Sequence, residues 1–275
     1  MRLVSRALLL CVPLVLFAIA GALYVPPAPV TDDSGGTDIA LGSLPKLPDW
    51  TADGLPDFSG YRDTTERKAA FFSFLYPRIE LANNRILLER EYLLSLSGKE
   101  PLSRTELDWL KKQAERLRVD ADNGSEQQFR QLAEKLDAIP PSLSLAQAAN
   151  ESAWGTSRFA TEGNNLFGQW CFTRGCGLVP LSRPEGANHE VAKFTSPYYS
   201  VRSYIQNLNR HAAYGQLRSI RAAARAEGKP FTGIALAQGL LSYSERGEEY
   251  IKEIRAMIRY NNLEFYDKKF RAQLD

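Results

Sequence analysis

Apolar side chains recur at helical spacing over residues 64–97. Most of them are separated by three, four or seven positions, and the set is Phe71, Phe72, Leu75, Ile79, Ala82, Ile86 and Leu93. This spacing predicts an amphipathic helix with one face buried. Pro77 lies inside it and is expected to kink or divide it. Two further amphipathic helices are predicted over 105–119 and 125–139, the second ended by Pro140 and Pro141.

A short, Ala-rich helix is predicted over 145–155, with Ser142 or Ser144 as its cap. Helical spacing of three and four residues places Gln147, Glu151 and Trp154 on one of its faces. After this helix the apolar segments become shorter. Three short strands are predicted over 166–172, 177–181 and 190–194, followed by helices over 197–213, 216–227, 232–243 and 247–261. The fold class is therefore α+β, mostly helical with a small antiparallel β-lobe and a preceding helical region.

The N-terminus has the pattern of a targeting segment. Arg2 and Arg6 precede 19 uncharged residues, 7–25. This length is sufficient to cross a bilayer with the N-terminus in the cytoplasm, although Ala18-Ile-Ala20 offers an alternative signal-peptide cleavage site. We therefore expect an inner-membrane protein with one span and a periplasmic body, or alternatively a protein secreted to the periplasm after cleavage.

Composition divides the rest of the chain into three parts. Pro, Gly and Ser residues mark a flexible spacer over 26–60, which is followed by a helical accessory region over 61–139 and a catalytic domain over 140–275. The 34 Lys and Arg residues nearly balance the 32 Asp and Glu residues, which leaves a net charge of +2. This balance argues against a nucleic-acid partner, because basic residues dominate nucleic-acid-binding proteins.

Cys171 and Cys176 are separated by four residues and are predicted to form a disulfide that closes a hairpin-like turn, as an exported protein allows. A metal site is the alternative, but only His189 lies nearby in sequence, so neither a metal nor another cofactor is predicted.

Glu151 is the strongest catalytic candidate. It lies near the end of the Ala-rich helix and before a Gly- and Asn-rich segment that is suited to approach a ligand. Burial would raise the pKa of its carboxyl group, which a general acid requires near neutral pH. The alternative is a solvated helix residue without a catalytic role.

Three motifs carry a family resemblance: Leu145-Ala-Gln-Ala-Ala-x-Glu-Ser-x-Trp-Gly155, Asn164-Asn-Leu-Phe-Gly168 and the later block Tyr243-Ser-Glu-Arg-Gly-Glu-Glu-Tyr250. Over residues 139–262 the chain resembles the glucosaminidase domain of glycoside hydrolase family 73, and within it the Bax-type enzymes of Gram-negative bacteria.

The resemblance implies a lysozyme-like α+β fold and cleavage of peptidoglycan glycan strands after N-acetylglucosamine, with Glu151 as the general acid. The second catalytic group is expected to be Glu190, Glu185 or the N-acetyl group of the substrate itself. Tyr243 is expected either to bind the acetamido group or to place Glu151, or else to be a core tyrosine. The expected substrate-binding residues are Gln147, Trp154, Asn165, Phe167, Trp170 and Tyr198.

Two other functions remain open at this stage. A lytic transglycosylase needs only one acid and closes an anhydro ring, but such enzymes usually carry a Gly-Leu-Met-Gln-like string where this chain has Asn165-Leu-Phe-Gly168. A non-catalytic peptidoglycan-binding protein would use the helices of residues 64–139 as a partner surface, and the intact Glu151 argues against it.

Overall fold

The computed structural model describes residues 44–181, 183 and 186–274. The predicted membrane segment, residues 7–25, and most of the predicted spacer lie outside the described residues. Among the described helices, none combines the length and the apolar character that a membrane crossing needs. The described part is mostly helical with a small antiparallel sheet, which agrees with the predicted lysozyme-like α+β class.

Helix α2, Thr64–Leu96, is the longest element of the described chain. The Asp63 side chain caps it by accepting a hydrogen bond from the backbone N–H of Glu66. Pro77 lies inside the helix without dividing it. Two short 3-10 turns precede α2, η2 (Asp49–Ala52) and η3 (Phe58–Gly60).

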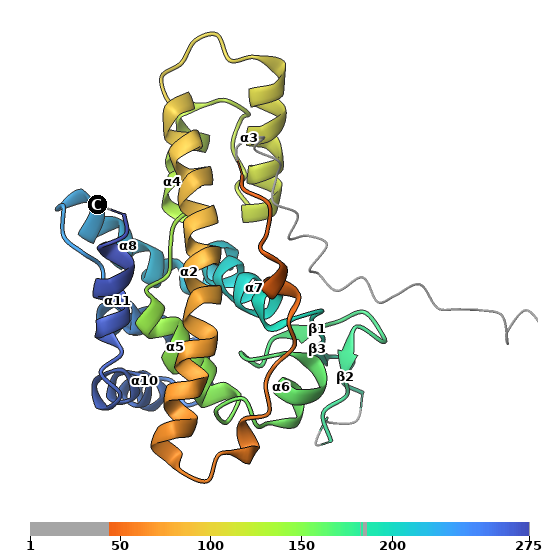
Figure 1. Cartoon of the computed structure of the whole chain (residues 1–275). Coiled ribbons are helices and arrows are strands. Elements are labelled where there is room, and N and C mark those ends of the chain that lie inside the picture. Colours follow the sequence, from red (N-terminus) through yellow and green to blue (C-terminus); the bar gives the residue numbers. More distant parts are fainter. Residues whose placement is uncertain (1–43, 182, 184–185, 275) are drawn as a thin grey trace, which may run out of the picture. The chain divides into compact units, whose positions relative to one another are not determined.

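Two helices pack against the C-terminal half of α2 and form what we call the arm. They are α3, Arg104–Leu117, and α4, Glu126–Lys135, each begun by a capping serine (Figure 1). The arm has a hydrophobic cluster of its own, formed by Leu93, Leu96, Trp109, Leu110, Leu117, Phe129, Leu132 and Leu136. Helix α4 ends at Lys135, so Pro140 and Pro141 do not terminate it as predicted.

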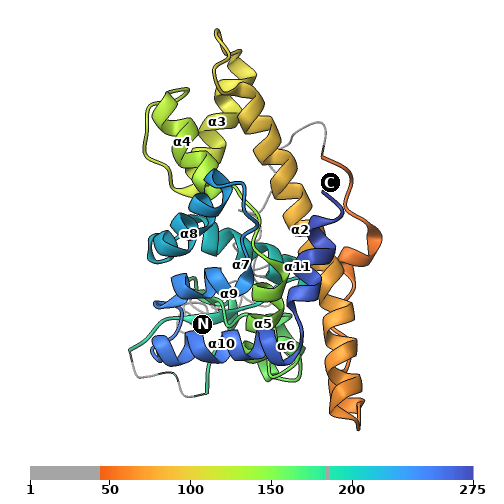
Figure 2. The same cartoon turned by 90° about the vertical axis from the view of Figure 1, so that its left-hand side faces the viewer.

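Helix α5, Pro141–Glu151, is the central element, and its residues 141–149 are all buried. It contacts α2, α9, α10 and α11, which surround it in Figure 2. The predicted serine caps are wrong, because the helix begins at Pro141 and already contains Ser142 and Ser144. The backbone N–H of Ser142 instead donates to the carboxylate of Asp267, over 2.8 Å. A side chain 125 residues away thus performs the capping function.

The remaining helices confirm most of the periodic pattern. They are α6 (Arg158–Gly163), α7 (Pro197–Arg210), η4 (Ala212–Tyr214), α8 (Gly215–Ala226), α9 (Gly233–Leu236), η5 (Ala237–Leu240), α10 (Glu248–Tyr260) and α11 (Glu264–Arg271). The single helix predicted over 232–243 is split into α9 and a 3-10 turn, and both α6 and α11 were not predicted.

The β-lobe has three short antiparallel strands, β1 (Trp170–Cys171), β2 (Gly177–Leu178) and β3 (Glu190–Ala192). Their order in the sheet is β1-β3-β2. The predicted Cys171–Cys176 disulfide is present. It does not close a hairpin between adjacent strands, because β3 lies between β1 and β2 and the bond links the two outer sides of the sheet.

Gly177 allows β2 to approach β3, and its replacement by alanine should destabilise the lobe. A Cβ atom there would lie 2.0 Å from the carbonyl oxygen of Val191, which is backbone and cannot move aside alone. We expect Gly177→Ala to lower the free energy of unfolding by about 1–3 kcal/mol, as overpacking does. Gly54→Ala is the matched control, since nothing lies within 4 Å of its added Cβ. Equal midpoints for the two variants in urea-induced unfolding would contradict this reading.

The main hydrophobic core crosses the predicted boundary at residue 139. It joins Phe71, Phe72 and Leu75 of α2 to side chains of α5, α7 and α10. At the boundary itself, Asn83 of α2 donates to the carbonyl oxygen of Ile139 and accepts from its N–H, at 2.8 and 3.0 Å. The first half of α2 therefore completes the core of the region that follows.

A buried charge cluster holds the arm to the main core. Asp137 is 2% exposed and accepts two hydrogen bonds from Arg225, while Arg90 and Arg221 lie 3.7 and 3.8 Å from its carboxylate. Burial by itself would raise the pKa of Asp137, but the hydrogen bonds from Arg225 and the charges of Arg221 and Arg90 hold it below its ordinary value. Asp137 is therefore a buried anion compensated by three cations.

Candidate functional site

Glu151 ends α5 with its carboxyl group half-buried. Its Oε1 accepts a hydrogen bond from the Tyr250 hydroxyl at 2.8 Å and a longer one from Asn150 at 3.4 Å. Gly168 lies against the other oxygen, since a Cβ there would be 3.8 Å from Oε2. Burial raises the pKa of Glu151, in spite of the two hydrogen bonds, which favour its ionised form. The shift favours the protonated form of the carboxyl group, which is the form that a general acid needs.

A chain of buried polar side chains fixes Tyr250. The Tyr204 hydroxyl donates to Oε1 of Gln147, and Nε2 of Gln147 donates to the Tyr250 oxygen at 2.9 Å. Because that oxygen already accepts from Gln147, the Tyr250 proton points to Glu151. Burial, followed by the nearby charge of Glu151, raises the pKa of Tyr250, so this hydroxyl stays protonated. Gln147, expected to touch substrate, is fully buried and orients Tyr250 instead.

Tyr243 supports the same site from α10's N-terminal side. Its hydroxyl donates to the carbonyl oxygen of Phe167 at 2.9 Å, and its ring stacks on Tyr250 with centroids 5.5 Å apart. The Phe167 ring in turn stacks on Tyr204 at 3.9 Å. These contacts bring the loop of residues 164–168 beside the carboxyl group of Glu151. That this segment approaches a ligand stays a prediction.

Asn165, Phe167 and Tyr198 lie in the interior rather than on an open surface. The Asn165 amide donates to the carbonyl oxygens of Gln169 and Ala192, and its Oδ1 accepts from the N–H groups of Phe167 and Gln169. All of these hydrogen bonds go to backbone groups, so the Asn165 side chain stabilises the loop. Tyr198 is fully buried and packs edge-on against Tyr199. As they lie, none of the three presents an open surface to a substrate.

Trp154 does not share a helix face with Glu151, which corrects the sequence prediction. Helix α5 ends at Glu151, and Ala153 and Trp154 have positive φ angles of 50° and 63°. The chain has therefore turned away before residue 154. The Trp154 ring packs edge-on against Phe71 and Phe72 of α2, with centroids 6.0 and 5.4 Å away.

Trp170 is the one predicted substrate contact that presents an open aromatic face. It is 60% exposed on β1, and its ring stacks on His189 with centroids 4.1 Å apart. An exposed tryptophan ring of this kind is suited to stack on the apolar face of a sugar.

Glu190 belongs to the β-lobe and is held by backbone groups. Its two oxygens accept from the N–H groups of Gly175 and Gly177 at 3.0 and 2.8 Å. The bond from Gly175, with that from Gly177 and the charges of nearby arginines, outweighs burial and lowers the pKa of Glu190. It is therefore ionised at neutral pH. Glu185, the other candidate for the second catalytic group, lies outside the described residues.

Sequence reasoning missed Tyr250 as the residue that contacts the acid. The sequence motif contains Tyr250, but the prediction from sequence gives the functional role to Tyr243. Spacing in the sequence could not distinguish the two tyrosines. In the structure their rings stack on each other, and both lie at the site. The signal that separates them is the long-range contact itself, 99 residues apart in sequence.

Comparison with known proteins gives one family match and one close relative. A family model described as mannosyl-glycoprotein endo-beta-N-acetylglucosaminidase matches residues 126–263, a range that holds Glu151, the 164–168 loop and Tyr250. Protein bax of Escherichia coli (strain K12) is 36% identical over 208 residues, which are 75% of this chain and 74% of the relative. No solved structure matches the chain.

Proposed function

From the premise that the chain belongs to the glucosaminidase family, and is thus a glycoside hydrolase, we propose that it cuts the glycan strands of peptidoglycan after N-acetylglucosamine. The family membership confirms the resemblance seen in the three sequence motifs. One observation supports the residue assignment above all: the half-buried Glu151, with its raised pKa, accepts a hydrogen bond from the Tyr250 hydroxyl beside the 164–168 loop.

In the proposed reaction Glu151 protonates the leaving oxygen as the glycosidic bond breaks. The sugar then carries oxocarbenium character, which a second group must stabilise or which an activated water must quench. Glu190 is ionised and each of its oxygens keeps a lone pair beyond its one backbone hydrogen bond, so it stays a candidate for that group. Glu185 and the substrate's own acetamido group are the other candidates.

Mass spectrometry of the fragments that the full chain releases from purified peptidoglycan tests the proposal. New reducing ends on N-acetylglucosamine are expected. Anhydromuramic ends would instead indicate a lytic transglycosylase, and binding without any fragment would indicate a wall-binding protein. The anomeric form of the fresh product distinguishes a carboxylate base from the acetamido group as the second catalytic group. Water activated by a carboxylate inverts the anomeric carbon, whereas an acetamido intermediate retains its configuration.

Tyr250→Phe is expected to lower kcat about 10- to 100-fold, because the acid loses the contact that positions it. The pH profile should shift as well. The Tyr250 hydrogen bond lowers the pKa of Glu151, so its loss raises that pKa further. An acid works only while protonated, so the alkaline limb of kcat against pH should move to higher pH.

Tyr260→Phe serves as the control for this variant, since Tyr260 is 83% exposed. It should leave both kcat and the pH profile unchanged. A Tyr250→Phe enzyme that lost activity at every pH in proportion, with its alkaline limb unmoved, would show a structural role only.

The site of action stays a prediction. The uncharged segment of residues 7–25 is expected to hold the enzyme at the inner membrane, facing the periplasm, or to direct its secretion there. The Cys171–Cys176 disulfide supports an oxidising compartment.

A further inference from the structure

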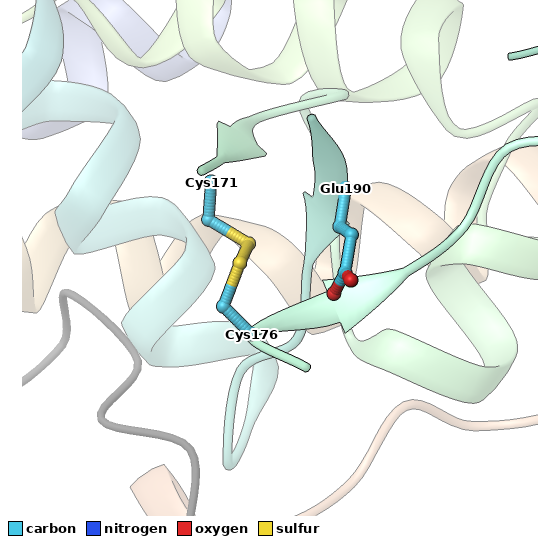
Figure 3. Close-up of side chains that lie close together, drawn as sticks. All are labelled: Cys171, Cys176 and Glu190. Carbon is cyan, nitrogen blue, oxygen red and sulfur yellow. A yellow bond between two sulfur atoms is a disulfide. The ribbon is translucent and has the colours of Figure 1, made fainter. Parts of the chain in front are cut away.

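Three potential metal ligands meet in the β-lobe. The sheet register pairs Cys171 directly with Glu190, and Cys176 immediately precedes β2 on the other side of β3. The two sulfur atoms and a Glu190 oxygen all lie within 4.8 Å of one another. Figure 3 shows the disulfide and the Glu190 side chain side by side on the sheet.

The donor set matches the chemistry of zinc. Zn²⁺ binds cysteine thiolates and carboxylates, and cysteine ligands two to four residues apart are typical of its sites. The four residues between Cys171 and Cys176 fall in that range. A tetrahedral ion needs neighbouring donors about 3.6–3.8 Å apart, given its bond lengths to sulfur and oxygen. The three donor atoms, all within 4.8 Å of one another, are near this spacing once the disulfide is reduced and its sulfur atoms separate.

The surroundings of Glu190 are already those of a metal ligand. Ligating carboxylates are usually held by further hydrogen bonds that fix their orientation. The N–H groups of Gly175 and Gly177 hold this carboxylate, one on each oxygen, and leave lone pairs on both. Cys176 is buried, whereas Cys171 is half-buried, so water can fill the fourth position from that side.

We propose that the chain binds one Zn²⁺ ion through Cys171, Cys176 and Glu190 when the disulfide is reduced. A dithiol reductant supplies two electrons and two protons, which convert the disulfide to two thiols and the reductant to its own disulfide. Zinc then displaces the two thiol protons and binds the thiolates. In the oxidised chain the sulfur atoms are bonded to each other and the site does not form.

The ion would replace the disulfide as the link between the two sides of the sheet. Either link holds the turn of residues 172–176, and with it the backbone N–H groups that grip Glu190. The β-lobe, including the exposed Trp170, would thus keep its structure in both redox states. This proposal does not depend on the reaction assigned to Glu151.

The test uses the untagged full chain carrying Cys11→Ser, because Cys11 is the third cysteine of the sequence. The chain is reduced with dithiothreitol, freed of it by gel filtration under argon, and titrated with Co²⁺ and then Zn²⁺. We expect the sulfur-to-cobalt charge-transfer band and the visible bands of a tetrahedral site, at one ion per chain. The oxidised chain should bind none, and zinc should raise the unfolding temperature of the reduced chain alone.

Variants assign the ligands. Cys171→Ser with Cys176→Ser should abolish binding, and Glu190→Gln should weaken it at least about 10-fold, on the scale of lost metal-site interactions. Glu162→Gln, on an exposed side chain of α6, should not change it. X-ray absorption at the zinc edge of the unsubstituted reduced site should give two sulfur ligands with oxygen neighbours, whether or not the variants fold. Absence of binding by the reduced chain, or full affinity in Glu190→Gln, would overturn the proposal.

Discussion

Replacing Glu151 by glutamine is expected to lower kcat on purified cell walls by about 10²- to 10⁴-fold, the usual contribution of a general acid. Glutamine keeps the shape of the side chain and can still accept the hydrogen bond from Tyr250. It has no acidic proton to give to the leaving oxygen. The unfolding midpoint should therefore stay near that of the wild-type chain while turnover is lost.

The control is Glu162→Gln, which alters an exposed glutamate that lies 3.8 Å from Arg158. Its turnover should equal that of the wild type. Reducing-sugar release measured on the same wall preparation decides the matter. Near-normal turnover by Glu151→Gln would remove Glu151 from the mechanism and leave the family membership untouched.

Asp137→Ala should produce the largest loss of stability, about 3–5 kcal/mol, the cost of removing one partner from a buried ion pair. The substitution leaves Arg221, which is almost fully buried, and Arg90 without their compensating charge. Arg221 keeps its hydrogen bonds to the carbonyl oxygens of Glu134 and Ala138, which limits the loss. Urea-induced unfolding at neutral pH measures the difference directly.

Asp108→Ala, on the exposed face of α3, is the matched control and should change stability by less than about 0.5 kcal/mol. The decrease of the free energy of unfolding at acid pH provides a second readout. The pKa of Asp137 is lower in the folded chain than in the unfolded one, so its contribution is complete above the ordinary carboxyl pKa and is lost as the pH falls through the folded value. In Asp137→Ala that part of the acid dependence should be missing.

Periodicity predicted the long helices well, because each buries one continuous stripe. The Phe71 to Leu93 pattern yielded α2 almost to the residue, and its inward positions are buried except Ile86, which is partly buried. The start of α5 was predicted incorrectly for a physical reason. Its cap is the carboxylate of Asp267, and no local pattern can report a hydrogen bond that spans 125 residues. The order of the strands was missed similarly, since β3 enters between two strands that precede it in sequence.

In the candidate site, too, sequence predicts the residues that local patterns mark and misses those whose role depends on long-range contacts. Glu151 was accessible to sequence reasoning because its motif and its Ala-rich helix both indicate a buried acid. The roles of Gln147 and Asn165 could not be predicted from sequence. The amide of Gln147 binds Tyr250, and that of Asn165 binds backbone groups of the 164–168 loop. Residue type indicated polarity at these positions, whereas only the fold reveals which partner satisfies it.

Helix α2 has a consequence for how small an active piece of this protein can be. The family match begins at residue 126, yet Phe71, Phe72 and Leu75 of α2 fill the core around α5. A fragment cut at the start of that match would leave the apolar surface around α5 bare to water, and we expect it to aggregate. Limited proteolysis should accordingly yield a resistant piece that retains α2. The unit to exchange between relatives in a chimera therefore begins upstream of the family match, before Phe58, whose ring packs on Phe71.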